Sequence, residues 1–294
     1  MATTIQQAFL KMKQNLEITG LQSATVSTRQ KNIREVMQAE LMVHDSFLTG
    51  SYSRNTMIAP LKEADIDIFF VLDVEYYYNY NNGQNGGQGG LLDLVKRTLR
   101  RTYTRTPDIS RSGQAVSIRF DDFMVDVVPG FKRQGGGFLI PNSITQDWIS
   151  TDPKKHVELM SYQNSQHGCD LVPMVKMIKG WNRNISDRFR AFHLEVLALD
   201  IFTGITISDF PSGARFYFDK GRTKIAQQNP DPAGYGDDVG RYINGKAAVD
   251  EAVAAFQLAY DRAIKAEDFA KRGYITHAFE MWSKIFGNYF PAYG

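Results

Sequence analysis

Residues 65–72 have the sequence DIDIFFVL, and this segment constrains the fold more than any other part of the chain. Its β-branched and aromatic residues predict a strand, and side chains two residues apart on a strand project from the same face. Asp65 and Asp67 are therefore expected to point together. Two neighbouring carboxylates repel each other when ionised, so the pair must be solvated or share cations. The segment predicts an apolar strand that starts with an anionic pair.

Two further features extend this pair into a candidate metal site. Asp126 lies in the apolar segment FMVDVV, and a neighbouring strand carrying it would complete a cage for Mg²⁺, a hard cation that prefers oxygen ligands. Gly50 allows a phosphate close to the backbone, and Ser51 offers an amide and a hydroxyl as donors. Two ions about 3.5–4 Å apart activate a hydroxyl and neutralise a leaving phosphate, so the pattern indicates nucleotidyl transfer. Taken singly, Asp-x-Asp and Gly-Ser also occur at ordinary strand ends and turns.

Composition limits the class of protein and its partners. The 294 residues are 43% hydrophobic, which predicts one two-lobed globular unit or two domains. The single cysteine, Cys169, forms no internal disulfide, and we find no run of about 18 apolar residues, so we expect a cytoplasmic protein without a membrane span. The net charge of +2, from 34 basic and 32 acidic residues, lacks the basic excess typical of nucleic-acid binding. We therefore expect no requirement for nucleic acid.

The N-terminal half is expected to mix helices, strands and loops. Apolar spacing predicts amphipathic helices from Ile5 and after Thr28. The Tyr-, Asn- and Gly-rich run at 76–90 predicts a mobile loop, because glycine at this density does not hold a regular element. The basic run at 96–105 predicts a helix with a solvated face, and a basic rim that attracts triphosphates is the alternative. Residues 130–142 are expected to form a loop.

From residue 151 the pattern becomes helical. Asp152 followed by Pro153 predicts the start of a helix. The segment 171–183 carries an apolar stripe on one face and basic residues on another. His193 and Glu195 are expected to be structural, because an isolated histidine among apolar neighbours on a helix more often makes one hydrogen bond than binds a metal. No histidine of the chain lies at a zinc-like spacing. The last predicted helices are amphipathic and span 247–265 and 267–286.

Seven segments spread over nearly the whole chain resemble one superfamily when they are taken together. They are GSYSRNT at 50–56, DIDIFFVL at 65–72, MVDVVPGF at 124–131, TDPKKH at 151–156, LVPMVKMIKGWNR at 171–183, FHLEVLA at 192–198 and WSKIFGNYFP at 282–291. This set resembles the polymerase-beta-like nucleotidyltransferases, and in particular their bacterial cyclic-oligonucleotide synthases, which are related to oligoadenylate synthase and to cyclic GMP-AMP synthase.

The resemblance implies a fold, an activity and partners. The implied fold is α+β, with a polymerase-beta-like core of mixed sheet and long N-terminal helix, and an oligoadenylate-synthase-like helical lobe. We expect residues 1–150 to form the catalytic core with its brace helices and residues 151–294 the substrate-binding lobe. The implied activity is template-independent synthesis of a cyclic di- or trinucleotide from ribonucleoside triphosphates, with release of pyrophosphate, in bacterial anti-phage (CBASS) signalling. It implies two Mg²⁺ or Mn²⁺ ions and a downstream effector that the product activates.

Roles follow for the residues that match the family's motifs. Asp65 and Asp67 would bind both ions. Asp126 would bind the ion that lowers the pKa of the acceptor hydroxyl, and would accept its proton. The residues expected to hold the donor triphosphate are Gly50, Ser51, Lys176 and Lys179.

Base recognition is assigned to two residues. Phe192 matches the position of an aromatic ring that stacks on a nucleobase, but the common Ser-Tyr pair is here Ala191-Phe192, so hydroxyl contacts to phosphate are lost. Asn164 is a candidate for reading the base, with a plain position on a helix surface as the alternative. A transferase acting on RNA or protein and an inactive nucleotide-binding module remain open as other functions.

Overall fold

The computed structural model describes residues 1–106 and 108–294. These residues divide into two compact units, Ile18–Val157 and Met1–Glu17 with Glu158–Gly294. The expected boundary was at residue 150, whereas the division falls after Val157. It also groups the first helix with the C-terminal residues. The expected α+β class is confirmed, because one unit holds a mixed sheet and the other is helical.

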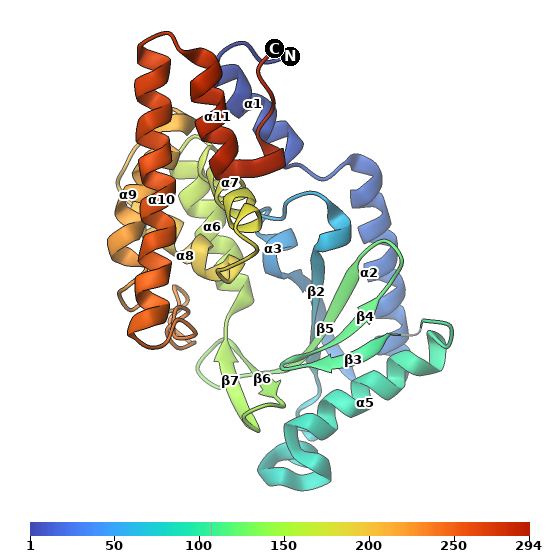
Figure 1. Cartoon of the computed structure of the whole chain (residues 1–294). Coiled ribbons are helices and arrows are strands. Elements are labelled where there is room, and N and C mark those ends of the chain that lie inside the picture. The colour runs from blue at the N-terminus through green and yellow to red at the C-terminus, as the bar shows by residue number, and fades with distance from the viewer. Residues whose placement is uncertain (107) are drawn as a thin grey trace. The chain divides into compact units, whose positions relative to one another are not determined.

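The first unit is built on a mixed sheet. Its strands are β1 (Val43–Thr49), β2 (Asp65–Leu72), β3 (Ile109–Ser112), β4 (Ala115–Arg119), β5 (Met124–Lys132), β6 (Phe138–Asn142) and β7 (Asp147–Thr151). The main path runs β1-β2-β5-β4-β3, and β6 and β7 extend from β5 (Figure 1). Among the described strands, β2 and β5 pair in parallel and the other pairs are antiparallel.

The helices of this unit include one that starts earlier than expected. They are α2 (Gly20–Glu40), α3 (Gly50–Ser53), α4 (Val74–Tyr80) and α5 (Gly87–Thr102), with 3-10 turns at Leu61–Glu63 and Asn81–Gly86. The predicted start of α2 after Thr28 is wrong. Thr19 caps the helix, because its hydroxyl accepts the N–H of Gln22 while the Gln22 side chain accepts the N–H of Thr19.

β2 divides its residues between the two faces of the sheet. The even-numbered residues from Ile66 to Leu72 lie in the main core of the unit, which the buried faces of α2 and α5 also line. Phe69 and Val71 lie on the opposite face, in a smaller cluster with Phe138. The two aspartates precede Phe69 on this second face. The period of two therefore places the anionic pair away from the main core.

Two segments predicted as loops are regular in large part. Residues 76–90 form the end of α4, a tight turn at Asn81–Gly86 in which residues 82–85 have non-helical backbone angles, and the start of α5. Tyr76, Tyr77 and Tyr80 of α4 pack against the core. A Cβ on Gly90 would lie 2.0 Å from the carbonyl oxygen of Asn85, so glycine permits close packing at this position. Residues 130–142 belong mostly to β5 and β6, because β5 continues to Lys132 and pairs with the start of β6.

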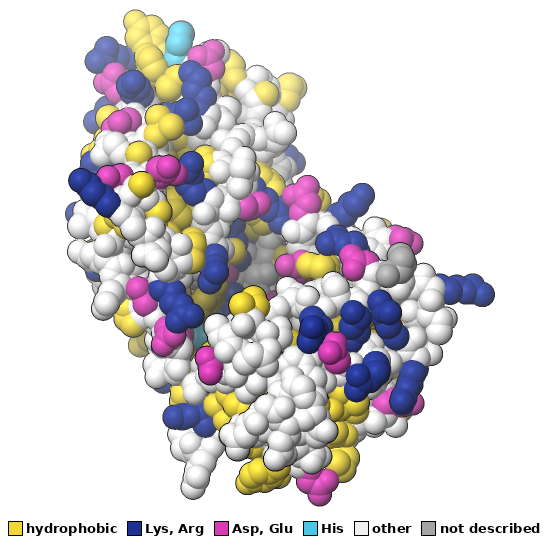
Figure 2. Space-filling model, turned by 60° about the horizontal axis from the view of Figure 1, so that its bottom comes forward, with side chains coloured by type: hydrophobic (Ala, Val, Ile, Leu, Met, Phe, Trp, Pro, Cys, Tyr) yellow, Lys and Arg dark blue, Asp and Glu magenta, His cyan; other side chains and the backbone are white. Residues whose placement is uncertain are grey.

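The basic run at 96–105 lies on α5 and the residues that follow it. α5 buries apolar side chains such as Val95 and exposes Arg97 and Arg100. Arg101 pairs with a glutamate of α2. On the face drawn in Figure 2, Lys and Arg side chains stand among acidic and uncharged ones. The basic run therefore lies on a solvated helix face, and attraction of triphosphates by this face stays a prediction.

The second unit is helical. Its helices are α1 (Ile5–Asn15), α6 (Pro153–Gln166, which begins in the first unit), α7 (Leu171–Asn184), α8 (Ala191–Phe202), α9 (Phe210–Lys224), α10 (Lys246–Lys271) and α11 (Ile275–Phe286), with a 3-10 turn at Gly287–Tyr289. The predicted break near residue 266 is wrong, because α10 continues to Lys271 and Gly273, with a φ of +80°, follows its end. None of the helices described is both long and apolar enough to cross a bilayer.

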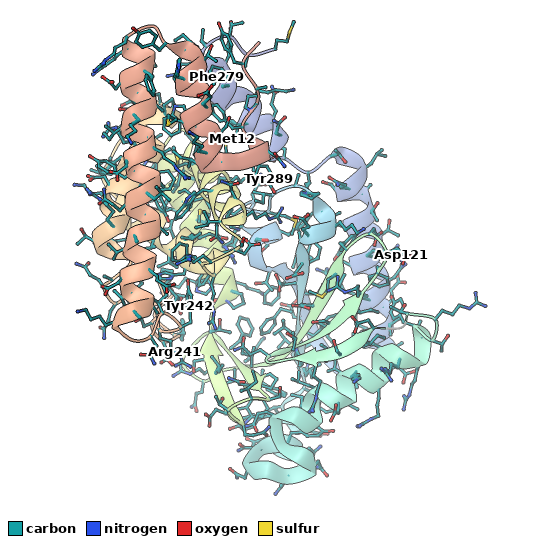
Figure 3. The ribbon with its side chains drawn as sticks, in the orientation of Figure 1. Met12, Asp121, Arg241, Tyr242, Phe279 and Tyr289 are labelled. Carbon is teal, nitrogen blue, oxygen red and sulfur yellow. The ribbon has the colours of Figure 1, made fainter. Side chains whose placement is uncertain are left out.

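Aromatic packing ties α1 into this unit. Phe9 is fully buried and meets Trp282 and Phe286 of α11 edge-on, at ring separations of 4.9 and 5.7 Å. Met12, labelled in Figure 3, follows Phe9 by three residues and is also fully buried, and a Cβ on Gly180 of α7 would lie 3.6 Å from it. The apolar face predicted for the first helix is therefore buried against helices that follow much later in the sequence.

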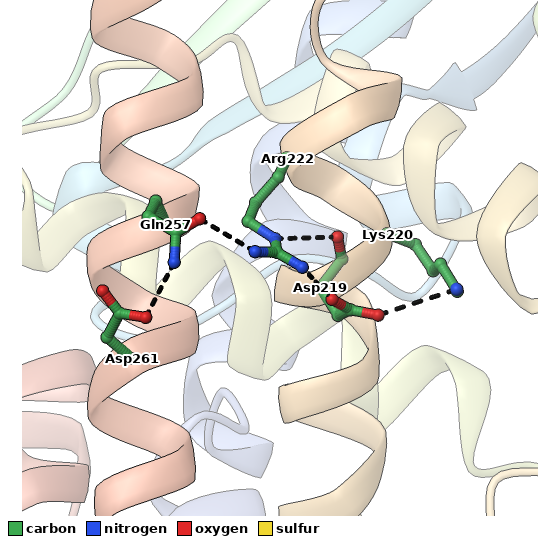
Figure 4. Close-up of polar contacts among 5 residues, drawn as sticks. All are labelled: Asp219, Lys220, Arg222, Gln257 and Asp261. Carbon is green, nitrogen blue, oxygen red and sulfur yellow. Dashed lines mark hydrogen bonds and ion pairs between the residues drawn. The ribbon is translucent and has the colours of Figure 1, made fainter.

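A polar network joins α9, a helix that was not predicted from the sequence, to α10 (Figure 4). Arg222 of α9 donates to Gln257 of α10 at 2.8 Å and pairs with Asp219 of its own helix. Gln257 in turn donates to Asp261 at 2.7 Å, and Lys220 lies 3.6 Å from the Asp219 carboxylate. These contacts hold α9 along one side of the long helix α10.

Candidate active site

The three predicted aspartates lie on two adjacent strands. In the parallel pairing of β2 with β5, Asp67 is the register partner of Asp126, and Asp65 is the partner of Met124. Asp65 is exposed, whereas Asp67 and Asp126 are half-buried. The fold therefore brings the carboxylates of Asp67 and Asp126 to neighbouring positions of the sheet, as the sequence predicts. Their roles in metal binding and catalysis stay predictions.

Asp126 is in an unfavourable electrostatic environment for a carboxylate. Burial raises the pKa of its carboxyl, and a hydrogen bond from Ser117, its register partner on β4, opposes this shift. Among the described residues, none donates a hydrogen bond to its buried Oδ1 atom. An unpartnered buried oxygen of this kind favours either a proton or a bound cation.

Gly50 lies directly against the second aspartate. Its φ is +67°, and a Cβ at this position would lie 1.7 Å from Oδ2 of Asp67. Only glycine fits here, because any side chain would displace the carboxylate and strain the backbone. Ser51 follows in α3, and its carbonyl oxygen accepts the N–H groups of Thr56 and Met57. The Gly-Ser turn therefore stands beside the carboxylates, where the predicted phosphate contacts require it.

The site suits hard divalent cations in chemistry but is not a preformed cage. Carboxylate oxygens are the ligands that Mg²⁺ prefers. In the described chain, no three acidic, histidine or cysteine side chains converge closely enough to hold an ion as they stand. The register of Asp67 with Asp126 and the unpartnered oxygen of Asp126 both fit an ion bound between the two strands. The metal site stays a prediction.

The two predicted triphosphate lysines are buried on α7. Lys176 is 3% exposed, and its Nζ lies 2.6 Å from Oε2 of Glu17. Lys179 is 6% exposed, and its Nζ lies 2.5 Å from Oε1 of Glu195. Neither lysine stands on a solvated helix face. Phosphate binding by them stays a prediction, and any phosphate would have to share them with these glutamates.

The candidate base-recognition residues have different settings. Phe192 is the second residue of α8 and is half-buried. The side-chain oxygen of Asn164 accepts the N–H of Val172 at 2.9 Å, and its backbone carbonyl accepts the N–H of Cys169. Asn164 therefore secures the turn between α6 and α7. Contact of either residue with a base stays a prediction.

Glu195 is predicted from the sequence to be structural. The structure shows it as a fully buried carboxylate paired with a predicted substrate lysine. The signal was present in FHLEVLA, where an acidic residue lies in a segment that is apolar except for it and His193. Such a carboxylate requires a partner when it is buried, but the sequence does not say which one.

Comparison with known proteins bears on the family and the fold of the chain. Residues 3–164, more than half of the chain, match the Second Messenger Oligonucleotide or Dinucleotide Synthetase domain. A cyclic AMP-AMP-AMP synthase from Acinetobacter is 26% identical to the chain, over 98% of this chain and 86% of that protein.

Solved structures share the fold at low sequence identity. CdnC of E. coli MS115-1, determined with ATP, has a TM-score of 0.79 at 16% identity, over 98% of this chain and 99% of that one. CdnG of Bradyrhizobium diazoefficiens, determined with GTP, has a TM-score of 0.74 at 11% identity, over 96% and 95%. The predicted fold and superfamily branch are confirmed, and synthesis of a nucleotide second messenger is the activity class of this family. The chain belongs to the Second Messenger Oligonucleotide or Dinucleotide Synthetase family.

Proposed function

We propose that the chain is a metal-dependent synthase that makes a cyclic di- or trinucleotide from ribonucleoside triphosphates. The observation that carries this proposal is the alignment of Asp67 with Asp126 on parallel strands, with the Gly50 backbone against Asp67. In a chain of this family, such an arrangement supports transfer of a nucleotidyl group. The product would activate an effector in bacterial anti-phage signalling.

The bond changes follow from the proposed substrates. A ribose hydroxyl of the acceptor attacks the α-phosphorus of the donor, the bond to the β-phosphate oxygen breaks, and pyrophosphate leaves. Two divalent cations, when bound, would lower the pKa of the hydroxyl and neutralise the leaving group. Asp126 takes the hydroxyl proton, and the burial that raises its pKa makes it a stronger base than an ordinary aspartate. A second transfer between the ends of the intermediate closes the ring.

Binding residues are assigned on both units. On the first unit, the backbone and hydroxyl of Ser51 hold the donor triphosphate, and Asp65 and Asp67 bind the cations. On the second unit, Lys179 contacts phosphate and Phe192 stacks on a base. Structures of CdnC with ATP and of CdnG with GTP support nucleoside triphosphates as the substrates.

The direct test is product identification. Purified protein is incubated with each combination of the four ribonucleoside triphosphates and Mg²⁺ or Mn²⁺, treated with phosphatase, and analysed by mass spectrometry. We expect a phosphatase-resistant product with the mass of a cyclic di- or trinucleotide, and no product when the cations are chelated.

Matched variants locate the activity. The double variant Asp65→Ala/Asp67→Ala should lose pyrophosphate release, whereas Asp147→Ala, at an exposed position of β7, should retain it. Turnover in the double variant would contradict the assignment. Label from triphosphate appearing in RNA or protein instead of small products would establish a different acceptor, and triphosphate binding without turnover would establish an inactive module.

A further inference from the structure

We propose that Glu195 is a positioning residue that holds the ammonium group of Lys179 for the donor triphosphate. The inference deepens the proposed function, because it depends on contact between Lys179 and phosphate. It assigns a task in the reaction to a carboxylate that the sequence presents as structural.

The pair is buried to a degree that stability alone does not explain. The side chains of Lys179 and Glu195 are 7% and 1% exposed, and their charged atoms are 2.5 Å apart. Removing two charges from water costs several kcal/mol per ion, and apolar residues of similar volume are often equally or more stable at such sites. We therefore infer that the pair serves to fix the position of the lysine charge for the reaction rather than to stabilise the fold.

A second lysine on the same helix shows what a looser arrangement looks like. Lys176 lies one turn before Lys179 and pairs with Glu17, whose side chain is 47% exposed. Glu17 has solvent to rotate into, although Lys176 itself is as deeply buried as Lys179. Glu195 has no solvent to rotate into, so it holds its lysine in one place whether or not a ligand is bound.

Glu195 also connects the lysine to the predicted base-binding residue. Glu195 follows Phe192 by three residues on α8, so both side chains lie on one side of the helix. The start of α8 is fixed to α7 by Asn182, which donates to the carbonyl of Phe189 at 2.8 Å and accepts its N–H at 3.0 Å. One rigid helix pair therefore sets the distance between the base-stacking ring and the phosphate-binding charge.

The test uses Glu195→Gln, which keeps the shape and the hydrogen-bonding oxygen but removes the charge. In this variant the free protein holds Lys179 without its glutamate charge, and a bound triphosphate supplies the missing negative charge. A non-hydrolysable ATP analogue with Mg²⁺ should therefore raise the unfolding temperature more in the variant than in the wild type. The kcat should fall by about tenfold or more while KM stays equal or decreases, because the lysine is misplaced rather than lost.

Two further variants keep the test decisive. Glu251→Gln removes an exposed partner of Arg188 in the same unit and should behave as the wild type. If Glu195→Gln does not fold, Lys179→Met/Glu195→Leu replaces the pair with apolar side chains and should fold but lose most of its stabilisation by the analogue.

The proposal is overturned if Glu195→Gln has the kcat and the analogue response of the wild type, or if the apolar double variant responds as the wild type does. Failure of the proposed function would be seen separately, as a wild-type protein that binds the analogue but forms no cyclic product.

Discussion

The carboxylates of the sheet and the lysines of α7 carry the charges of the proposed reaction, and their charges are balanced differently. Asp67 and Asp126 are adjacent in register and both acidic, and Asp126 holds a buried oxygen to which no described residue donates a hydrogen bond. Lys176 and Lys179 are more deeply buried, yet each is paired with a glutamate. The sheet site has an excess of negative charge and requires a cation. At the helix site each lysine is already neutralised by a glutamate, so a phosphate must replace that glutamate or share the lysine with it.

The largest effect is expected from closing the space beside Asp67. Gly50→Ala places a Cβ 1.7 Å from Oδ2 of Asp67 at a φ of +67°, so the carboxylate or the turn must move. We expect turnover to fall by about a hundredfold or more, because a displacement of 1 Å at a reacting centre has effects of this size. Steady-state pyrophosphate release measures it.

A control at a second glycine distinguishes the steric clash with Asp67 from the strain of a positive φ. Gly135 also has a positive φ, of +87°, but a Cβ there would meet nothing within 4 Å. Gly135→Ala should cost stability of about 1 kcal/mol and leave turnover nearly unchanged. Equal losses of turnover in the two variants would mean that the turn, and not the carboxylate, sets the activity.

Asp126→Asn should have opposite effects on stability and on activity. The raised pKa means that the folded state resists ionisation of this carboxyl, so the charge lowers the free energy of unfolding at neutral pH. The variant should be more stable than the wild type in the absence of divalent cations, while its turnover falls by about a hundredfold. Chemical denaturation and an activity assay on the same samples measure both.

The stability difference between Asp126→Asn and the wild type should decrease as the pH falls. The folded pKa of Asp126 lies above its ordinary value, so the cost of ionisation is fully present above the folded pKa and disappears as the pH falls below the unfolded one. The stability gain of Asp126→Asn should therefore vanish in acid. A gain that persists at low pH would show that its origin is packing and not charge.

The helical unit contains a buried histidine, His193, whose pKa is shifted in the opposite direction to that of Asp126. His193 is fully buried, its Nδ1 lies 3.2 Å from the hydroxyl of Tyr242 (labelled in Figure 3), and burial lowers its pKa to about 4. Below pH 6.5 the unfolded chain binds a proton here that the folded chain rejects until about pH 4. The free energy of unfolding should fall by on the order of 3 kcal/mol over this range.

Substitution isolates this contribution. His193→Gln should flatten the pH dependence of unfolding between pH 6.5 and 4 relative to the wild type, as measured by denaturant titrations at several pH values. The same substitution at the exposed His277 is the control. A wild-type slope in His193→Gln would assign the acid sensitivity to other groups.

The smallest effect is expected from an exposed ion pair of the sheet unit. Lys154 lies 3.0 Å from Asp45, and the hydrogen bond it donates holds the pKa of that carboxyl below its ordinary value. Both side chains are nearly half exposed, so Lys154→Met should cost only about 0.5 kcal/mol. Urea denaturation measures this loss, and added salt should reduce it. A loss above about 2 kcal/mol would show that this exposed pair stabilises the fold as strongly as a buried pair.

The sequence predicts the sheet site better than the helix site, and the reason is local geometry. The alternation in DIDIFFVL sets which face each aspartate occupies, and the apolar context of Asp126 indicates a neighbouring strand. Both inferences depend on periodicity of two, which the sequence displays directly.

The rest depends on contacts between distant segments, which local pattern does not reveal. From the sequence, Lys176 and Lys179 are predicted to face solvent or substrate, because no local pattern indicates that they pair with Glu17 and Glu195. The run at 76–90 reads as a loop because the close packing of Gly90 is visible only in the folded chain. α9 was missed although Asp209 caps it and Pro211 lies in its first turn.

The most direct test of the charge difference is to count cations at the sheet site. Mn²⁺ is titrated into the protein with a non-hydrolysable ATP analogue, and free Mn²⁺ is measured by electron paramagnetic resonance in the wild type, in Asp126→Asn and in Glu195→Gln. We predict two bound ions per chain in the wild type, at least tenfold weaker binding of one ion in Asp126→Asn, and two ions bound at least as tightly as in the wild type in Glu195→Gln. Equal ion binding by the wild type and Asp126→Asn would contradict the account.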